Sequence, residues 1–459
     1  MSEGSVRSEP IFTISGVRGV VGRTFTARTA LEISASFGAW LGKGRVAVGR
    51  DTRATGEMVV AAVSAGLTSV GCDVLDLGVV PSPKAVFAVK HLGAAGGIIV
   101  TASHNPPDWN GLKLVGPNGL PLSERELFRV REDWRSEAVK PVASERVGRV
   151  LPGRLSGRYE KSVTECVDAQ ALTRAGLKVA VDPGNGAGSF VTPYVLQQLG
   201  CKLTAINAVP DGAFPRPIEP TEEALAGLVE VVKAEGADVG FAHDCDADRL
   251  VCVDEKGEVL PEDFTLAVVV DSYLEANPGS AFVTNVASSS LFEEIAERHG
   301  SRVYRSRVGE SFVVQKMIEV GAPIGGEGSC GGVILPRLSY TRDGILAAAK
   351  VLEVLATRGE TLSAITGRMP RYFSVRTKLP CSREEAQQVV TALAERHRGE
   401  TIDLTDGFKL LKRGEWVLVR PSGTEPVLRI MSEARTQESA KRLNDETRKY
   451  VEDILAGLR

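Results

Sequence analysis

Hydrophobic and polar positions follow the same order in three separate segments of the chain. Each segment begins with a short β-branched run, continues through a polar or glycine-rich loop and a helical stretch, and returns after a glycine to a second apolar run. The segments begin at Arg45 (RVAVGRDTRATGEMVVAAVSAGLTSVGCDVLDLG), Lys178 (KVAVDPGNGAGSFVTPYVLQQLGCKLTAIN) and Ala281 (AFVTNVASSSLFEEIAERHGSRVYRSRVG). A strand, a helix and a strand in this order favour parallel pairing through a right-handed crossover.

The glycines that end the three predicted helices are Gly71, Gly200 and Gly300, which lie 129 and 100 residues apart. These intervals are too long for a solenoid repeat and suit three related α/β domains of ordinary size. Beyond about residue 368 the pattern changes to paired strand runs flanked by a helix from Arg383 to about His397 and a charged helix from Thr436 onward. This arrangement is typical of a smaller α+β domain.

We therefore expect four domains, with boundaries at 1–152, 153–257, 258–368 and 369–459. A polar stretch around Ala143 to Leu155 is a candidate linker between the first two. The length of 459 residues agrees with several domains, and the 43% apolar and 25% charged shares are those of packed globular chains.

Charge and cysteine usage exclude several classes of protein. The net charge of -3 gives no overall attraction to nucleic acid or to an anionic membrane, so we expect neither as a partner. The seven cysteines are scattered without a CxxC pair, which argues against a disulfide framework or a structural zinc site. The polar start MSEGSVRSEP and the lack of a long apolar run lead us to expect a reducing, cytoplasmic location.

The first loop with candidate chemistry, TASHNPP, follows a buried-strand run from Ile98 to Val100. Pro106 and Pro107 prevent a helix from continuing there, so we expect Ser103 on a stiff, exposed loop. By composition alone such a serine is more often a turn or capping residue than a nucleophile. The loop therefore carries weight only together with other motifs.

The second loop, HDCDADR, follows an apolar strand from Val239 to Ala242 and places Asp244, Asp246 and Asp248 at alternating positions. Three carboxylates this close repel one another unless a cation neutralises them, and hard oxygen ligands select Mg²⁺ or Ca²⁺. The alternative is a solvated acidic turn. The adjoining buried strand favours metal binding.

Two further loops combine glycines with polar side chains. Glu327 and Ser329 lie in GGEGSCGG, where the backbone can approach a ligand while a carboxylate and a hydroxyl bind a sugar diol; a glycine-rich hairpin turn is the alternative. In VRPSGTEP, Arg420 ends a strand run, and a guanidinium, two hydroxyls and free backbone N–H groups follow within five residues. That combination suits a phosphate dianion.

Together the four loops, in the order TASHNP, DCDADR, GEGS and RPSGTEP, resemble the α-D-phosphohexomutase family. The likeness covers nearly the whole chain, including SGVRG from Ser15 and GRDTR from Gly49. It implies three related α/β domains with mixed, largely parallel sheets and a C-terminal α+β domain around a central cleft. The fourth domain would act as a phosphate-binding lid.

The resemblance also implies roles for individual residues. Ser103 would carry a phosphoryl group and, with Asp244, Asp246 and Asp248, bind Mg²⁺. Sugar hydroxyls would be bound by Glu327 and Ser329, and the non-reacting phosphate by Arg420, Ser422, Gly423 and Thr424. The residues that would line the reaction centre are Arg18, His104, Lys113 and Arg249, with Lys113 the candidate general acid or base.

The implied activity interconverts hexose 6-phosphates and hexose 1-phosphates through phosphoserine and a hexose 1,6-bisphosphate, with a glucose 1,6-bisphosphate-type activator. Phosphoryl transfer needs charge neutralisation above all, which Mg²⁺ with Arg18, Lys113 and Arg249 would supply. The form SGTEP favours glucosamine as the sugar, and a phosphomannomutase/phosphoglucomutase is the alternative. We expect small hexose phosphates as partners and a monomer or homodimer.

Two other function classes are compatible with parts of the pattern. A phosphatase working through phosphoserine would need a second, histidine-rich metal site, but the five histidines at 91, 104, 243, 299 and 397 form no cluster in the sequence. A non-catalytic sugar-phosphate sensor would not need both Ser103 and the three aspartates. Their joint presence favours the mutase.

Overall fold

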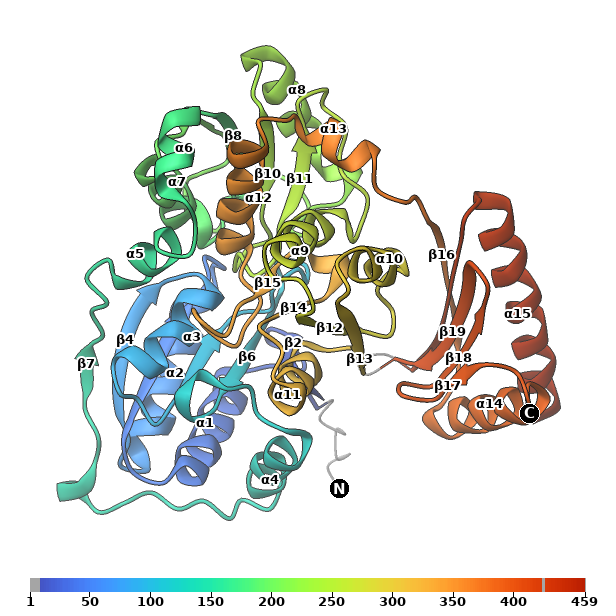
Figure 1. Cartoon of the computed structure of the whole chain (residues 1–459). Helices are drawn as coiled ribbons and strands as arrows, with labels where there is room; N and C mark the ends of the chain where they lie inside the picture. The colour runs from blue at the N-terminus through green and yellow to red at the C-terminus, as the bar shows by residue number, and fades with distance from the viewer. Residues whose placement is uncertain (1–8, 423–425, 459) are drawn as a thin grey trace.

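Four separate β-sheets, one for each predicted domain, divide the chain in the computed structural model, which describes residues 9–422 and 426–458 (Figure 1). Each sheet takes its strands from one of the four predicted segments, while the boundaries themselves stay predictions. The expected fold class, three α/β units followed by an α+β unit, is confirmed. Within the described ranges, no helix is long and apolar enough to cross a membrane.

The first domain contains a mixed seven-stranded sheet. In spatial order its strands are β1 (Ile11–Thr13), β2 (Gly16–Val20), β6 (Trp109–Val115), β5 (Gly96–Val100), β3 (Arg45–Arg50), β4 (Asp73–Val79) and β7 (Val150–Pro152). Its helices are α1 (Ala27–Leu41), α2 (Gly56–Ser69), α3 (Ser82–His91) and α4 (Glu124–Arg135). The strands β5, β3, β4 and β7 run parallel to one another. On the other side of β5, each of β6, β2 and β1 pairs antiparallel with the strand before it in this order.

The second and third domains each contain a four-stranded sheet with three parallel strands and one antiparallel edge strand. The second has the strand order β11 (Val251–Asp254), β10 (Val239–Ala242), β8 (Lys178–Asp182) and β9 (Lys202–Ala205), with helices α5 (Arg158–Thr164), α6 (Ala169–Ala175), α7 (Gly188–Gln198) and α8 (Ala226–Glu235). The third has the order β13 (Arg302–Ser306), β12 (Ala281–Asn285), β14 (Ile324–Gly326) and β15 (Val333–Ile334), with helices α9 (Phe264–Ala276), α10 (Leu291–Arg298), α11 (Glu310–Val320), α12 (Gly344–Arg358) and α13 (Leu362–Gly367).

The predicted repeat is confirmed in all three domains. The strand pairs β3 and β4, β8 and β9, and β12 and β13 are parallel neighbours, each joined through one helix. Gly71, Gly200 and Gly300 follow those helices with φ angles of +88°, +84° and +59°, a region that glycine enters without the strain of a side chain.

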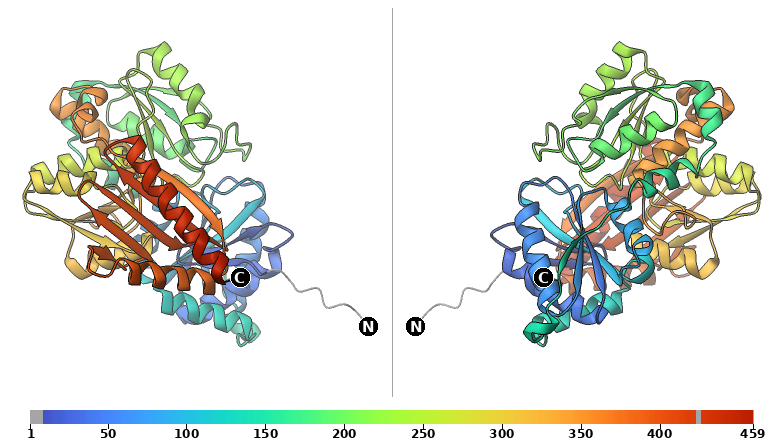
Figure 2. Two further views of the ribbon diagram at one scale, coloured as in Figure 1. Left: turned by 90° about the vertical axis from the view of Figure 1, so that its right-hand side faces the viewer. Right: turned by 90° about the vertical axis from the view of Figure 1, so that its left-hand side faces the viewer.

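The C-terminal domain is an antiparallel sheet with two helices, as the sequence predicts. Its strands, in spatial order, are β16 (Phe373–Pro380), β20 (Val427–Ala434), β19 (Glu415–Pro421), β18 (Phe408–Lys412) and β17 (Ile402–Asp403), and its helices are α14 (Arg383–Arg396) and α15 (Gln437–Leu458). Figures 1 and 2 show this domain in orange and red, and in Figure 1 it lies at the right-hand side of the molecule.

The second and third domains share one hydrophobic core, because α12 of the third domain packs on α6 and α7 of the second and on its own α9. The candidate linker around Ala143 to Leu155 has regular structure of its own. It contains β7, which pairs in parallel with β4. The hydrogen-bonding edge of β4 is therefore covered by this segment.

A small buried contact joins the fourth domain to the third. Val286 packs with Trp416 and Leu418, and the side chain of Lys409 donates from Nζ to the backbone oxygen of Val286 at 2.6 Å. The same Nζ lies 4.0 Å from the centre of the Trp416 ring, a cation–π geometry. Because Lys409 is only 4% exposed, its ammonium group has lost its hydration at this contact.

Candidate active site

Three of the four candidate loops occupy the same place in their domains. Each connects the last parallel strand to the antiparallel strand beside it: the serine loop (residues 101–108) joins β5 to β6, the acidic loop (243–250) joins β10 to β11, and the sugar loop (327–332) joins β14 to β15. Loops at the carboxyl ends of parallel strands are the usual binding positions of α/β folds. The repeat in the sequence therefore explains why these three loops are related.

Ser103 lies in contact with the acidic loop of the second domain. Its Oγ donates a hydrogen bond of 2.8 Å to Asp244 Oδ2, and its backbone N–H donates to Thr101 Oγ1 at 2.9 Å. The expectation of an exposed serine is wrong, because the acidic loop covers Ser103 and leaves it 1% exposed. Its φ of +50° is unusual for a residue with a side chain, so the surrounding contacts must hold the loop in place.

Arg53 is the main support of the serine loop. Its side chain is fully buried and pairs with Asp51 through Nε at 3.2 Å. The terminal nitrogens donate to backbone oxygens along the loop, at Ser103 (2.7 Å), Asn105 (2.6 Å), Pro106 (2.5 Å) and Trp109 (3.0 Å). The motif GRDTR contains Arg53, but no local pattern indicates this role, because these loop partners lie about fifty residues away along the chain.

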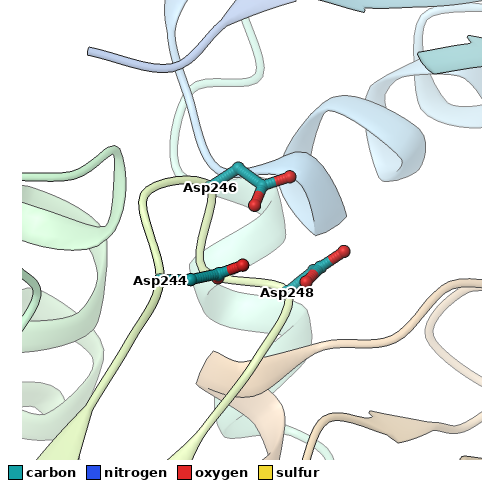
Figure 3. Close-up of side chains that lie close together, drawn as sticks. All are labelled: Asp244, Asp246 and Asp248. Atoms are coloured by element: carbon teal, nitrogen blue, oxygen red, sulfur yellow. The ribbon is translucent and has the colours of Figure 1, made fainter. Parts of the chain in front are cut away.

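The three aspartates converge as predicted. One ligand atom from each of Asp244, Asp246 and Asp248 lies within 4.8 Å of the other two, and Figure 3 shows the side chains leaving one turn toward the same region. Among the described residues, Asp246 Oδ1 and Asp248 Oδ1 are buried without a hydrogen-bond partner. Burial and the two neighbouring carboxylates raise the pKa of Asp244. Buried oxygens lacking donors, in a cluster of three carboxylates, fit a hard divalent cation such as Mg²⁺.

Lys113 projects from β6 into this cluster. Its Nζ donates to Asp246 Oδ2 at 2.6 Å and to Asp248 Oδ2 at 2.7 Å. Burial alone would lower the pKa of Lys113, but the two carboxylates raise it above its ordinary value. The side chain is therefore held as a cation beside the serine loop.

Arg18, His104 and Arg249 lie around the serine loop. Arg18 donates from Nη1 to Asn105 Oδ1 at 2.8 Å, and Arg249 Nη2 lies 2.8 Å from His104 Nδ1. Burial, together with the Arg249 and Arg18 charges, lowers the pKa of His104 to about 2. The ring is neutral at physiological pH, so its Nδ1 accepts the hydrogen bond from Arg249. The structure thus brings together the residues expected at the reaction centre.

Glu327 and Ser329 differ in their surroundings although they share the sugar loop. Glu327 is 5% exposed; its Oε1 accepts from Asn285 Nδ2 and from the Gly309 N–H, both at 2.9 Å. Ser329 is exposed. The carboxylate is thus fixed in place by its own domain, whereas the serine side chain faces solvent.

Arg342 was missed by sequence reasoning. It lies just before α12, and its guanidinium pairs with Glu327 Oε2 at 2.7 Å, Asp248 Oδ2 at 2.9 Å and Glu310 Oε2 at 3.0 Å. One buried cation therefore connects the sugar loop to the acidic loop across two domains. The only local signal is an arginine preceding Asp343, the helix N-cap, and that pattern does not indicate such partners.

The fourth loop follows β19. Arg420 donates from Nε to Asp406 Oδ2 at 2.9 Å, and the Ser422 N–H donates to the Val427 oxygen at 2.9 Å, which closes the turn toward β20. The predicted ligands Gly423 and Thr424 lie outside the described residues. Arg420 and Ser422 line a cleft of about 1570 Å³ between the first, third and fourth domains. A small cavity beside it, which shares Ile14, is lined by Arg18, Lys113 and Arg342.

The whole domain series matches known family models in order. The models for phosphoglucomutase/phosphomannomutase α/β/α domains I, II and III match residues 9–139, 157–257 and 261–372, and the model for the C-terminal domain matches residues 377–449. The chain belongs to the phosphoglucomutase/phosphomannomutase family. It is therefore a phosphohexomutase of the α-D-phosphohexomutase family, an isomerase that acts by phosphoryl transfer, as its motifs indicate.

Relatives of this phosphohexomutase carry more than one name. It is 42% identical to a "Phosphoglucomutase/phosphomannomutase" of Thermococcus kodakarensis, over 97% of this chain and 99% of the relative. It is 37% identical to a "Probable phosphoglucosamine mutase" of Pyrococcus abyssi, over 97% and 98%. The crystal structure of a phosphoglucomutase/phosphomannomutase family protein from Burkholderia thailandensis superposes with a TM-score of 0.86 at 29% identity, covering 97% of both chains.

Proposed function

We propose that this phosphohexomutase interconverts hexose 6-phosphates and hexose 1-phosphates through a phosphoryl group carried on Ser103 Oγ. The observation that carries the proposal is the contact between Ser103 and the aspartate cluster. A buried hydroxyl lies 2.8 Å from a carboxylate in a group of three that fits a divalent cation, with Lys113 and Arg249 close by. This is the concentration of positive charge that a transferring phosphoryl group requires.

The reaction consists of two phosphoryl transfers, one from Ser103 to the sugar and one from the sugar back to Ser103. In the first, the phosphorus–oxygen bond to Ser103 breaks as a bond to the free sugar hydroxyl forms; the hydroxyl proton leaves to a base, and the released serine oxygen takes up a proton. The product is a hexose 1,6-bisphosphate and a free serine. After the sugar reorients, the other phosphoryl group returns to Ser103, the serine proton leaves, and the released sugar oxygen takes up a proton. A trace of glucose 1,6-bisphosphate would phosphorylate a resting enzyme in the same way.

Asp244, Asp246 and Asp248, together with an oxygen on Ser103, would hold Mg²⁺, which when bound supplies charge neutralisation to the phosphoryl oxygens. Lys113 is our candidate for moving the proton at the reacting oxygen, because its Nζ lies among the aspartates beside the serine loop. The structure favours its charged form, so donation to the leaving oxygen is the first role we assign to it.

Two sites would hold the sugar phosphate while it reacts. We assign the non-reacting phosphate to Arg420, Ser422, Gly423 and Thr424, and the sugar hydroxyls to Glu327 and Ser329. Both C1 and C6 phosphates must fit the same phosphate site in turn, since the bisphosphate reacts at either end. A site on the separate fourth domain, where Arg420 and Ser422 line the cleft, meets this requirement.

For the sugar, we propose an uncharged hexose, glucose or mannose, carried as its phosphate, as the first candidate. Glu327 of the sugar loop and the nearby Glu310 are both paired with Arg342, which leaves them less able to bind the amino group of glucosamine. The relative with 42% identity is also named a phosphoglucomutase/phosphomannomutase. Glucosamine, which the SGTEP sequence favours, becomes the second candidate.

The function is tested by incubating the purified protein with Mg²⁺, a trace of glucose 1,6-bisphosphate and, separately, the 6-phosphates of glucose, mannose and glucosamine. Phosphorus NMR should show a hexose 1-phosphate signal growing to a constant ratio without inorganic phosphate. Stoichiometric release of phosphate would support a phosphatase instead. The ratio of kcat/KM values among the three sugars decides between the two candidates.

A further inference from the structure

Asp406 lies between the proposed phosphate site and the third domain. Its Oδ2 accepts a hydrogen bond from Arg420 Nε at 2.9 Å and one from the backbone N–H of Val308 at 3.0 Å. The carboxylate side chain is only 11% exposed, and that of Arg420 13%. A charge-assisted hydrogen bond in such a sheltered position constrains both partners.

The turn that carries Asp406 is shaped to fit Arg420. The next residue, Gly407, has a φ of +91°, a conformation that side chains rarely adopt. A Cβ at Gly407 would lie 2.4 Å from the Val419 oxygen and 2.9 Å from Arg420 Cα. The turn therefore lies directly on the backbone of the arginine, and this close approach brings the Asp406 carboxylate to Nε.

The third-domain residues that contact Asp406 lie in a segment that also forms a hydrogen bond to the sugar loop. Val308 N–H binds Asp406, and the next N–H along the chain, that of Gly309, binds Glu327 Oε1 at 2.9 Å. Arg307, just before them, pairs with Glu124 of the first domain at 2.8 Å, and its Nε lies 4.0 Å from Asp406 Oδ1. Adjacent peptide groups thus bind Asp406, the partner of Arg420, and Glu327 of the sugar loop.

Asp406 engages one nitrogen of the Arg420 guanidinium. In the described part of the chain, the terminal nitrogens Nη1 and Nη2 donate to no residue, whereas Nε is bound by the carboxylate. A guanidinium held through Nε has its orientation fixed, and its terminal nitrogens are the pair that can bind two phosphate oxygens.

We propose that Asp406 is a positioning residue for Arg420. Its carboxylate is fixed by the Val308 N–H and orients the Arg420 guanidinium. The terminal nitrogens of Arg420 are then placed in advance for the substrate's non-reacting phosphate, at a fixed position relative to Glu327. Asp406 acts through Arg420 and does not itself touch substrate. This inference rests on the proposed function, because it assigns Arg420 to that phosphate.

A double-mutant cycle tests this role directly. Asp406→Ala, Arg420→Ala and the double variant are compared with the wild type, using glucose 6-phosphate with Mg²⁺ and a trace of glucose 1,6-bisphosphate. Asp406→Ala should raise KM and lower kcat/KM by about 10- to 100-fold, the range for hydrogen bonds to charged groups. In the Arg420→Ala background the same change should lower kcat/KM by no more than about twofold, as expected for residues acting through one contact.

Asp403→Asn is the matched control. It removes a carboxylate three residues away that accepts the N–H of Thr405 within its own turn, so its KM should equal that of the wild type. Equal thermal midpoints for all variants would show that the fold is intact.

Three outcomes would overturn the inference. If Asp406→Ala costs as much in the Arg420→Ala background as in the wild type, Asp406 does not act through the arginine. A fall in KM for Asp406→Ala would show that the carboxylate competes with phosphate for Arg420. If the wild type itself forms no hexose 1-phosphate, the proposed function fails, and the inference fails with it.

Discussion

Ser103 and Asp244 are 141 residues apart in the chain, yet the serine Oγ donates a 2.8 Å hydrogen bond to the aspartate Oδ2. The contact joins the first domain to the second and places the serine hydroxyl against a cluster of carboxylates. Each loop follows the parallel strand that lies beside an antiparallel strand of its sheet, and the packing of the two domains brings the loops into contact. The domain repeat thus brings together the two halves of the proposed reaction centre.

Asp246→Asn should weaken Mg²⁺ binding, because one anionic ligand becomes neutral and Lys113 loses a carboxylate partner. We expect the Mg²⁺ concentration for half-maximal activity to rise at least about 10-fold. Even changes to residues that only hydrogen-bond to metal ligands typically lower metal affinity by about 10- to 100-fold. Titration calorimetry with Mg²⁺ gives a second reading. Asp445→Asn, on exposed α15, should change neither value, and an unchanged titration for Asp246→Asn would show that the loop is a solvated turn.

Arg53→Met should destabilise the serine loop. The change leaves Asp51 buried without its cation and removes the donors from four backbone oxygens. Breaking a buried ion pair by removing one partner costs about 3 to 5 kcal/mol. Urea unfolding should move to lower concentration and mutase activity should fall, while Arg23→Met, at an exposed position, should leave both unchanged.

Much of this arrangement can be predicted from local sequence. The β3–α2–β4 unit and its two counterparts follow from hydrophobic periodicity and their terminal glycines, and the aspartates converge because they alternate on one turn after a buried strand. Contacts between domains are different. Arg342 and Arg53 have partners in separate segments, so no local pattern indicates them.

The burial of Ser103 was missed for the same reason. Prolines predict a stiff loop, but whether another domain covers that loop depends on how the sheets pack. A polar loop can be buried where other groups satisfy its hydrogen bonds, and here Arg53 and Asp244 supply them.

Arg420→Ala should raise KM and lower kcat together. A lost hydrogen bond to a charged group costs about 1.5 to 3 kcal/mol, and the proposed contact also aligns the sugar for transfer. Phosphorylation of Ser103 by the bisphosphate should suffer less than the full cycle. Steady-state kinetics and single-turnover labelling separate the two effects, and a wild-type KM would contradict the assignment of the phosphate site.

Lys409 should give the contact between the third and fourth domains a pH dependence. Burial lowers the pKa of Lys409 to about 7 in the folded protein, below its ordinary value of 10.5. Between these values the unfolded chain binds the extra proton, so stability contributed at this site rises with pH above about 7. The gain in thermal midpoint from Lys409→Met should therefore be largest near pH 7 and shrink toward pH 9. A gain that grows with pH would contradict this.

The central claim is that Ser103 carries the transferred phosphoryl group. Wild-type protein and Ser103→Ala are incubated with Mg²⁺ and glucose 1,6-bisphosphate labelled in both phosphates, and the digested peptides are analysed by mass spectrometry. The wild type should carry one labelled phosphoryl group, on Ser103, and pass it to added glucose 6-phosphate. Ser103→Ala should keep the wild-type fold, carry no label and form no glucose 1-phosphate. Full mutase activity in Ser103→Ala, or a label on another residue that is passed to the sugar, would contradict the account.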